Sequence, residues 1–211
     1  MKNFLSLIVC LSMLSVVFTG CSDDDDDENR IPTAGVSRVD ATINGVGEQI
    51  DSVFLTLGVN AETVLLRSEF KDNQFKFDLP EDVNSGNLFS LSDFEEFKGL
   101  SISNSSARVC YAEFNAYKGT ERSGYIVYSN GETTLSHVAV NFIYVDRDVT
   151  ISGKQTSTNE GFEIHTVTNC SFVKGWNLIA FYSSETPAVE HTTNYTTDIP
   201  SGIKWSYVPF E

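Results

Sequence analysis

The sequence predicts an all-β protein, built as an antiparallel β-sandwich or barrel of about ten strands. From Val36 to the C-terminus, apolar and polar residues alternate with a period of two, which is the pattern of strands with one face in the core. Glycine, asparagine and aspartate interrupt this alternation at short intervals, as they do at turns. Helical periodicity is confined to one short segment, so we expect sheets to form the core.

The first half of this region contains two strictly alternating segments and the one helix candidate. Residues 53–57 and 75–79 alternate between apolar and polar side chains, so each is predicted to be a strand. A short helix is predicted near residues 92–98, because Ser92 and Glu95 have the spacing of a capping box. Gly99 suits the position that follows a helix.

The second half of the region is richer in alternating segments. Asn130 and Gly131 both tolerate positive φ, so this dipeptide predicts a tight type I′ hairpin between two strands. Trp176 alternates in phase with Leu178, which predicts that its indole packs in the core. The predicted strands of this half are residues 107–117, 123–129, 138–144, 149–151, 162–170 and 176–182.

The polar stretch at residues 101–106 is the best candidate for a domain boundary. It would separate a β-sandwich module at 36–100 from a second β module at 105–211, and the alternative is one continuous β domain over 36–211. In its pattern of strands, the first module loosely resembles transthyretin-like and immunoglobulin-like modules.

The N-terminus predicts a secretory signal peptide over residues 1–20. A short positive start with Lys2 is followed by an apolar run at 4–18 and by the small residues Thr19 and Gly20. An apolar run of about 15 residues is too short to span a hydrocarbon core of ~30 Å. We therefore expect this segment to be cleaved from the mature chain.

The residues that follow resemble those of a class of lipid-anchored proteins. Cys21 directly follows Gly20, as in bacterial lipoproteins, in which the thiol of the new N-terminal residue carries a diacylglycerol. The acidic run at 23–28 is similar to the export tether of surface lipoproteins from Bacteroidota-type bacteria. Repulsion between adjacent carboxylates also predicts that this run does not fold. The resemblance implies lipidation of Cys21, with palmitate among its chains, a disordered tether over 21–35, and an outward-facing anchor in the outer membrane.

The formal net charge of the chain, −15, limits the classes of partner. Contacts with phosphates need clustered lysine and arginine, so a nucleic-acid partner is disfavoured. Acidity of this size mainly promotes solubility.

Two cysteines remain in the region that is predicted to fold. Cys110 alternates in phase with Ala112 and Phe114, and Cys170 alternates in phase with Phe172, so both side chains are expected to face the core. Core-facing cysteines suit either a disulfide or two small buried hydrophobic side chains. An oxidising compartment would permit the bond, and the sequence leaves both alternatives open.

No arrangement of residues predicts catalysis, metal binding or a cofactor. His137, His165 and His191 are dispersed, without the spacing of metal ligands, and we expect them at the surface. Asp146 and Asp148 alternate at a strand break and could face a common cation, but a solvated turn is the simpler interpretation. The chain is therefore expected not to be an enzyme.

Aromatic residues near the C-terminus are the one functional lead. Trp205 and Tyr207 lie in a fairly polar segment, where their rings could be exposed on a sheet. Exposed flat rings can stack on the faces of sugars, because the rings combine a large apolar surface with a polar tip. Trp205 and Tyr207 are therefore candidate glycan contacts.

Ser52 is a candidate site of modification. Asp51-Ser52-Val53 is similar to the three-residue pattern that Bacteroidota-type bacteria use for protein O-glycosylation. The alternative is that Ser52 only begins a strand.

The sequence thus predicts a lipid-anchored, outward-facing, non-enzymatic protein of the outer membrane. The first hypothesis is that it binds a glycan as an accessory of carbohydrate capture, with Trp205 and Tyr207 exposed. The second is a structural or adhesive subunit that binds protein partners in a complex of the cell envelope. That hypothesis expects an unpaired strand edge or an exposed apolar patch.

Overall fold

The computed structural model describes residues 33–57, 63–94, 97–131, 136–159, 162–186 and 190–210. The predicted signal peptide, Cys21 and the acidic tether lie outside the described residues. Ile31–Glu211 forms one compact unit.

Strands make up most of the described chain, which confirms the predicted all-β class. Short 3₁₀ turns lie between some of the strands: η1 (Gly47–Gln49), η2 (Ser85–Asn87) and η3 (Leu91–Asp93). The strands are β1 (Arg38–Thr42), β2 (Ser52–Leu57), β3 (Thr63–Glu69), β4 (Gln74–Asp78), β5 (Phe89–Ser90), β6 (Ser101–Ile102), β7 (Arg108–Lys118), β8 (Glu121–Ser129), β9 (Ser136–Val145), β10 (Val149–Asn159), β11 (Phe162–Phe172), β12 (Gly175–Thr186), β13 (Glu190–Thr196) and β14 (Lys204–Pro209).

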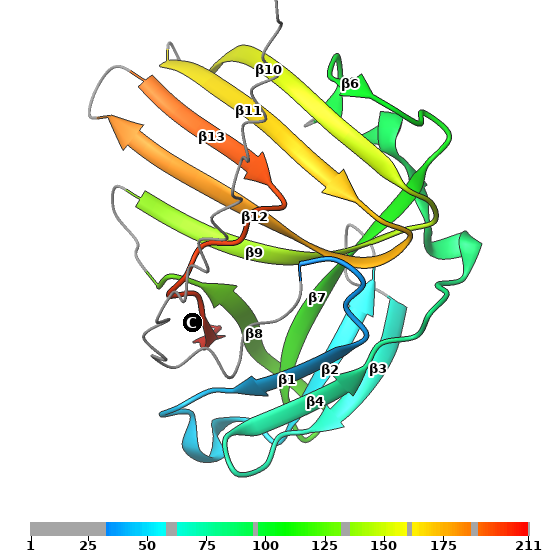
Figure 1. The fold of residues 1–211 in the computed structure, drawn as a ribbon. Coiled ribbons are helices and arrows are strands. Elements are labelled where there is room, and N and C mark those ends of the chain that lie inside the picture. Colours follow the sequence, from blue (N-terminus) through cyan, green and yellow to red (C-terminus); the bar gives the residue numbers. More distant parts are fainter. Residues whose placement is uncertain are drawn as a thin grey trace, which may run out of the picture. The chain divides into compact units, whose positions relative to one another are not determined.

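These strands form a small and a large sheet (Figure 1). β1 and β4 pair as a two-stranded ribbon. The large sheet has the order β3-β2-β7-β8-β9-β12-β13-β11-β10-β6, while β14 pairs with β8 and β5 pairs with β7. Its pairs are antiparallel except for β11 and β13, because β13 lies between β11 and β12, which the chain connects directly.

Each face of the large sheet carries its own core. On the ribbon face, Phe114 and Phe142 of the sheet pack in one cluster with Phe75 and Phe77 of the ribbon. Burial of these rings drives the two layers together. The cluster on the opposite face is formed by Leu91, Phe97, Ala107, Val109, Ile143, Val145, Val149, Ile151, Cys170, Phe172 and Ile179.

Both cysteines are buried and both thiols are free. Cys110 belongs to the cluster on the ribbon face, and Cys170 belongs to the cluster on the opposite face. The backbone of the sheet therefore separates the two thiols. Of the two alternatives that the sequence leaves open, the structure has the pair of buried thiols and not the disulfide.

The segment predicted as a short helix at 92–98 forms 3₁₀ turns in its described part. Ser90, not Ser92, is the N-cap residue, and its hydroxyl accepts a hydrogen bond from Ser92 N at 3.3 Å. The amide of Phe97 donates to Phe94 O at 3.1 Å, which is the i to i+3 spacing of a 3₁₀ turn. Phe97 is buried against the sheet, and this packing favours a tight turn over a regular helix.

The tight two-residue hairpin lies elsewhere than predicted. Asp72 and Asn73 both have positive φ, at 53° and 62°, and they close a hairpin between β3 and β4. Lys71 and Gln74 exchange two backbone hydrogen bonds across it, of 3.0 and 2.9 Å. Asn130 is not among the residues with positive φ, so the predicted type I′ turn at Asn130 and Gly131 is wrong.

The segments on either side of residues 101–106 share one sheet. β2, from the first segment, pairs with β7, from the second, over six residue pairs from Ser52↔Tyr117 to Leu57↔Ala112. The ribbon-face cluster also takes residues from both segments.

Candidate functional site

Trp205 and Tyr207 are half-buried, and both pack against the core cluster on the ribbon face. β14 pairs with β8 so that Trp205 lies opposite Tyr128 and Tyr207 lies opposite Ile126, whose side chain is buried. The Trp205 ring lies nearly parallel to the rings of Tyr128 and Phe142, at centroid distances of 4.7 and 6.0 Å. The Tyr207 hydroxyl donates to Ser123 O at 3.0 Å. Neither residue therefore presents the flat exposed ring that the sequence led us to expect.

Several exposed apolar side chains lie on β3, on β8, and on or directly after β14, whereas Phe89 and Val173 are exposed elsewhere. Val64, Tyr125, Val208 and Phe210 are 42, 40, 44 and 44% exposed. Tyr125 is paired directly with Val208, and the Phe210 ring lies edge-on to Tyr125 at 4.9 Å. We call this solvent-facing side of β3, β2, β7, β8 and β14 the platform.

A single row of paired positions crosses the platform. Residues that pair directly across strands share a face of the sheet. The row contains Arg67 on β3, Phe54 on β2, Asn115 on β7, Tyr125 on β8 and Val208 on β14. Side chains far apart in sequence are thus aligned across five strands.

Two arginines stack on aromatic rings of the platform. The Cζ atom of Arg67 lies 4.4 Å from the centroid of Phe54, whose other neighbour is the Tyr117 ring at 4.1 Å. The Cζ atom of Arg122 lies 4.6 Å from the centroid of Tyr125. Such contacts hold a guanidinium in place while leaving the edge that carries its N–H groups available.

A buried polar pair lies beneath these rings. Asn115 is 1% exposed, and its Nδ2 donates to Thr56 Oγ1 at 2.7 Å. Its Oδ1 has no hydrogen-bond partner among the described residues, and the same is true of the buried Nε of Arg122. Buried polar atoms without partners are uncommon, because each loses its hydration without compensation.

Three strands diverge beside this row and leave an opening in the sheet. β7 pairs with β9 through its N-terminal half and with β8 through its C-terminal half, while β8 and β9 pair only briefly. The innermost pairs are Ala112↔Phe142, Phe114↔Ile126 and Tyr128↔Val140. Glu113, Val127 and Asn141 lie between these pairs, so the ladder of backbone hydrogen bonds is interrupted there. We call this place the strand junction.

A cavity of about 200 Å³ occupies the strand junction. Its lining includes side chains from both faces of the sheet: Ala112, Glu113, Phe114, Tyr125, Ile126, Val127, Tyr128, Ala139, Val140, Asn141, Phe142 and Trp205. Those on the ribbon face are largely buried, whereas Tyr125 and Asn141 are exposed on the platform side. The cavity therefore has an apolar, partly aromatic floor, which includes Trp205, and it opens toward the platform.

The mouth of the cavity carries polar groups that are not used within the fold. The Glu113 carboxylate, the Tyr125 hydroxyl and the Asn141 carboxamide make no hydrogen bond with the described residues. Burial raises the pKa of Glu113, and the positive charge of Arg122 opposes this shift. These groups can donate to and accept from a polar ligand without breaking an existing contact.

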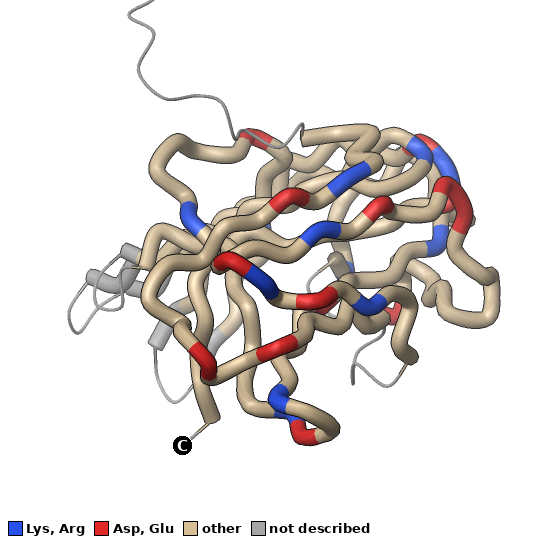
Figure 2. The backbone as a smooth tube through the Cα atoms, turned by 90° about the horizontal axis from the view of Figure 1, so that it is seen from below, with Lys and Arg blue, Asp and Glu red and all other residues tan. Residues whose placement is uncertain are grey.

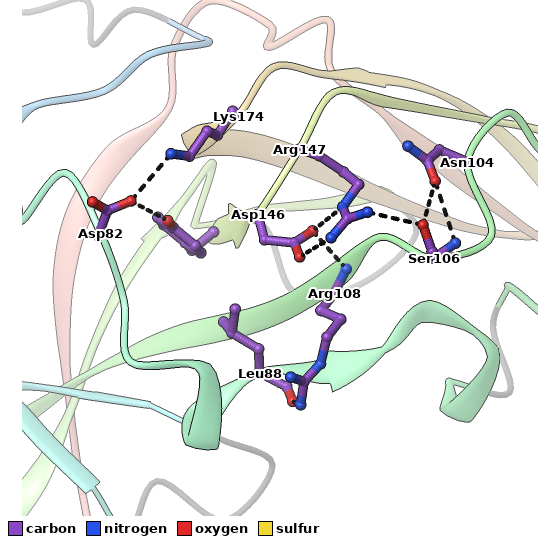
Figure 3. A network of polar contacts seen from close by, with 9 residues as sticks. Asp82, Leu88, Asn104, Ser106, Arg108, Asp146, Arg147 and Lys174 are labelled. Carbon is purple, nitrogen blue, oxygen red and sulfur yellow. Dashed lines mark hydrogen bonds and ion pairs between the residues drawn. The ribbon is translucent and has the colours of Figure 1, made fainter.

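A second polar cluster connects loops at another part of the sheet (Figure 3). Asp146 accepts hydrogen bonds from the backbone N–H of Arg108 at 2.9 Å and from Arg147 Nε at 3.0 Å. Burial works against ionisation of Asp146, but these hydrogen bonds outweigh it and lower the pKa of the carboxyl. Asp148 accepts from the backbone N–H of Lys174 at 2.8 Å. The two aspartates thus cap separate loops, which accords with the structural interpretation of this strand break.

The other candidate residues lie apart from the platform cavity. His165 Nδ1 lies 3.1 Å from Thr156 Oγ1, His137 is half-buried, and the His191 side chain lies outside the described part. Among the described residues, no group of histidines, cysteines and carboxylates is arranged to hold a metal ion. Ser52 begins β2, is half-buried, and donates to Asp51 Oδ1 at 3.1 Å.

Charged residues are mixed along the backbone. Figure 2 shows lysine and arginine positions interspersed with aspartate and glutamate positions. This view has no basic stripe of the kind that follows a nucleic-acid backbone.

No family model, no curated protein and no solved structure matches this chain. Within the described residues, no helix has the length and apolar character needed to cross a membrane.

Proposed function

We propose that this protein is a non-enzymatic lipoprotein of the outer cell surface that binds a glycan on the platform, at the strand junction. The observation that carries the proposal is the cavity of about 200 Å³ between β7, β8 and β9. Its apolar floor and its polar mouth match the two sides of a sugar ring, which has apolar C–H faces and a rim of hydroxyl groups.

The polar mouth supports a sugar over a purely apolar ligand. Glu113 and Asn141 can hydrogen-bond to hydroxyl groups, and neither side chain is engaged elsewhere in the described chain. The exposed ring of Tyr125 adds an apolar surface at the rim of the cavity. The Tyr125 ring thus joins Trp205, which the sequence predicted as a glycan contact and which lines the floor of the cavity, whereas Tyr207 does not line it.

A binding screen with matched variants tests the proposal. We expect the full-length protein, purified in detergent, to bind at least one member of a broad panel of host and microbial glycans. Asn141→Ala and Tyr125→Ala should weaken that binding about tenfold, which corresponds to the loss of one good contact. Val173→Ser is the control, because Val173 is 42% exposed, close to the 40% of Tyr125, but does not line the cavity.

Silence of the protein across the panel, or equal loss of binding in the control, would overturn the glycan proposal. Melting curves of each variant would show that the fold is retained.

A protein partner is the second candidate, because the platform exposes apolar side chains and β14 pairs on one side only among the described strands. An unpaired strand edge can accept a strand from another chain, although Pro209 at the end of β14 limits this edge. Val208→Ser should abolish capture of such a partner on intact cells and leave glycan binding nearly unchanged. If Val208→Ser lost glycan binding but still captured the partner, the second candidate would be excluded.

The anchor is proposed from the resemblance of the residues around Cys21 to lipoproteins. We expect metabolic labelling with a palmitate analogue to mark the wild-type protein, and Cys21→Ser to abolish the label and to release the protein from membranes. Digestion of the protein on intact cells by added protease would support an outward orientation. A labelled Cys21→Ser variant would overturn the assignment of the lipid to this residue.

A further inference from the structure

We infer that the glycan bound on the platform is acidic, and that Arg67 and Arg122 hold its carboxylate or sulfate groups. The inference rests on the proposed glycan-binding function and specifies the chemical class of the ligand.

The positions of the two guanidinium groups are fixed by aromatic rings. Arg67 lies over Phe54, and Arg122 lies over Tyr125 with the Phe210 ring 5.3 Å from its Cζ atom. A stacked guanidinium presents its planar fork of N–H donors sideways, which suits bidentate contact with a carboxylate or a sulfate. The ordering of these long side chains has already occurred in the free protein, so binding loses less entropy.

Neither guanidinium lies within ion-pair distance of a carboxylate in the described part of the chain, although Arg122 is close enough to Glu113 for the two charges to interact. Arg38 and Arg147 lie elsewhere and form ion pairs, of 2.8 Å with Asp40 and 2.9 Å with Asp146. Arg67 and Arg122 form no ion pair with a described residue, although the whole chain carries a net charge of −15. The buried Nε of Arg122 also has no hydrogen-bond partner there. An acidic ligand would supply each arginine with an ion-pair partner at close range.

The spacing of the arginines selects a ligand with more than one acidic group. Phe54 and Tyr125 lie in the same row, with Asn115 on the strand between them. Adjacent strands are about 4.8 Å apart, so the rings that carry the two guanidinium groups are separated by about 10 Å. A chain of acidic sugars repeats its charges along its length and can reach both groups, whereas a single acid cannot.

The acidic residues of the platform lie outside this row. Glu69 is exposed on β3 and pairs with Ser52, one row away from Arg67. Glu113 pairs with Thr56, one row away on the other side, and borders the cavity. Both can accept hydrogen bonds from sugar hydroxyl groups. Glu113 is also close enough to Arg122 for their charges to interact, so it offsets part of the attraction of Arg122 for an acidic group.

The test compares glycans that differ only in the acidic group. Oligogalacturonate is compared with its methyl ester, and sulfated dextran is compared with dextran, on the full-length protein in detergent. We expect the acidic member of at least one pair to bind tenfold or more tightly than its neutral counterpart. Raising the salt concentration should weaken this binding, because the arginines are solvent-accessible.

Variants locate the contacts. Arg67→Gln and Arg122→Gln should each lower the affinity for the acidic member about tenfold, and Arg38→Gln should leave it unchanged while removing the same charge. Arg122→Lys keeps the positive charge but loses the planar fork of N–H donors. It should therefore bind more tightly than Arg122→Gln and less tightly than the wild-type protein.

The outcomes separate this inference from the proposed function. Equal binding of the acidic and neutral members in every pair would overturn the inference and leave glycan binding intact. The absence of binding to any glycan would overturn both. If Arg38→Gln lost as much affinity as the platform variants, net charge alone would explain the effect. That result would contradict the contacts assigned to Arg67 and Arg122.

Discussion

The carboxamide of Asn115 donates a hydrogen bond of 2.7 Å to the hydroxyl of Thr56, across β7 and β2 and beneath the exposed rings of the platform. Both residues are buried, and Thr56 Oγ1 in turn donates to Glu113 O at 3.4 Å. This chain of contacts connects the aromatic row to the residue at the mouth of the cavity. The polar pair thus fixes the position of the aromatic row relative to the mouth of the cavity.

Thr56→Val should destabilise the protein, since it leaves the buried Nδ2 of Asn115 without an acceptor. We expect a loss of about 1–3 kcal/mol in the free energy of unfolding, the usual cost of an unsatisfied buried group. Chemical denaturation measures it. Thr56→Val combined with Asn115→Leu should cost less than the sum of the two single changes, because neither polar partner remains. An unchanged midpoint for Thr56→Val would contradict the role of this hydrogen bond.

Gly124→Ala should detach β14 from β8. A Cβ atom at Gly124 would overlap the carbonyl oxygen of Val208 and would come within 2.8 Å of Tyr207 Cε2 and 2.9 Å of Pro209 Cα. Backbone atoms on both sides cannot move apart without breaking the pairing of these strands. We expect a lower melting temperature and a red shift of Trp205 fluorescence. Gly86→Ala is the control, because its nearest neighbour would be the Asn84 side chain at 3.3 Å.

Cys110 and Cys170 should remain reduced thiols that react slowly. Burial raises the pKa of each to about 12, so little of the reactive thiolate is present near neutral pH. Alkylation followed by mass spectrometry should leave both residues unlabelled in the native protein and label both after unfolding. A peptide pair joined through Cys110 and Cys170 after oxidation would contradict their separation by the sheet.

Glu113→Gln should stabilise the protein at neutral pH by an amount that depends on pH. Because burial raises the pKa of Glu113 above its ordinary value of 4.5, the folded state holds this proton more tightly than the unfolded state. Stability is therefore lost as the pH rises through the interval between the two pKa values. The variant lacks this loss, so its advantage in melting temperature should shrink as the pH falls toward 4.5. A difference that stays constant with pH would contradict the burial of this carboxyl.

The sequence predicted the strands better than it predicted their partners. Alternation correctly placed Trp176, Cys110 and Cys170 in the core, because it reports which side chains share a face of one strand. It could not show that Trp205 packs against the core, since that depends on the pairing of β14 with β8, about 80 residues earlier.

The platform was missed for the same reason. Arg67, Phe54, Asn115 and Tyr125 form a row only through three strand pairings, one of which joins β2 to β7, far apart in the sequence. The strand junction likewise depends on β7, which pairs with β9 along one half and with β8 along the other. No pattern in the sequence of β7 itself indicates this exchange of partners. One signal was present: Asn115 interrupts the apolar run of β7 with a polar residue that alternates in phase with Glu113.

The most direct test of a glycan site at the strand junction is hydrogen exchange of the full-length protein with and without the glycan that binds best in the screen. We expect slower exchange at residues 112–115, 125–128 and 139–142, which come together only at the junction. Protection confined to other strands, with these three segments unchanged, would contradict it.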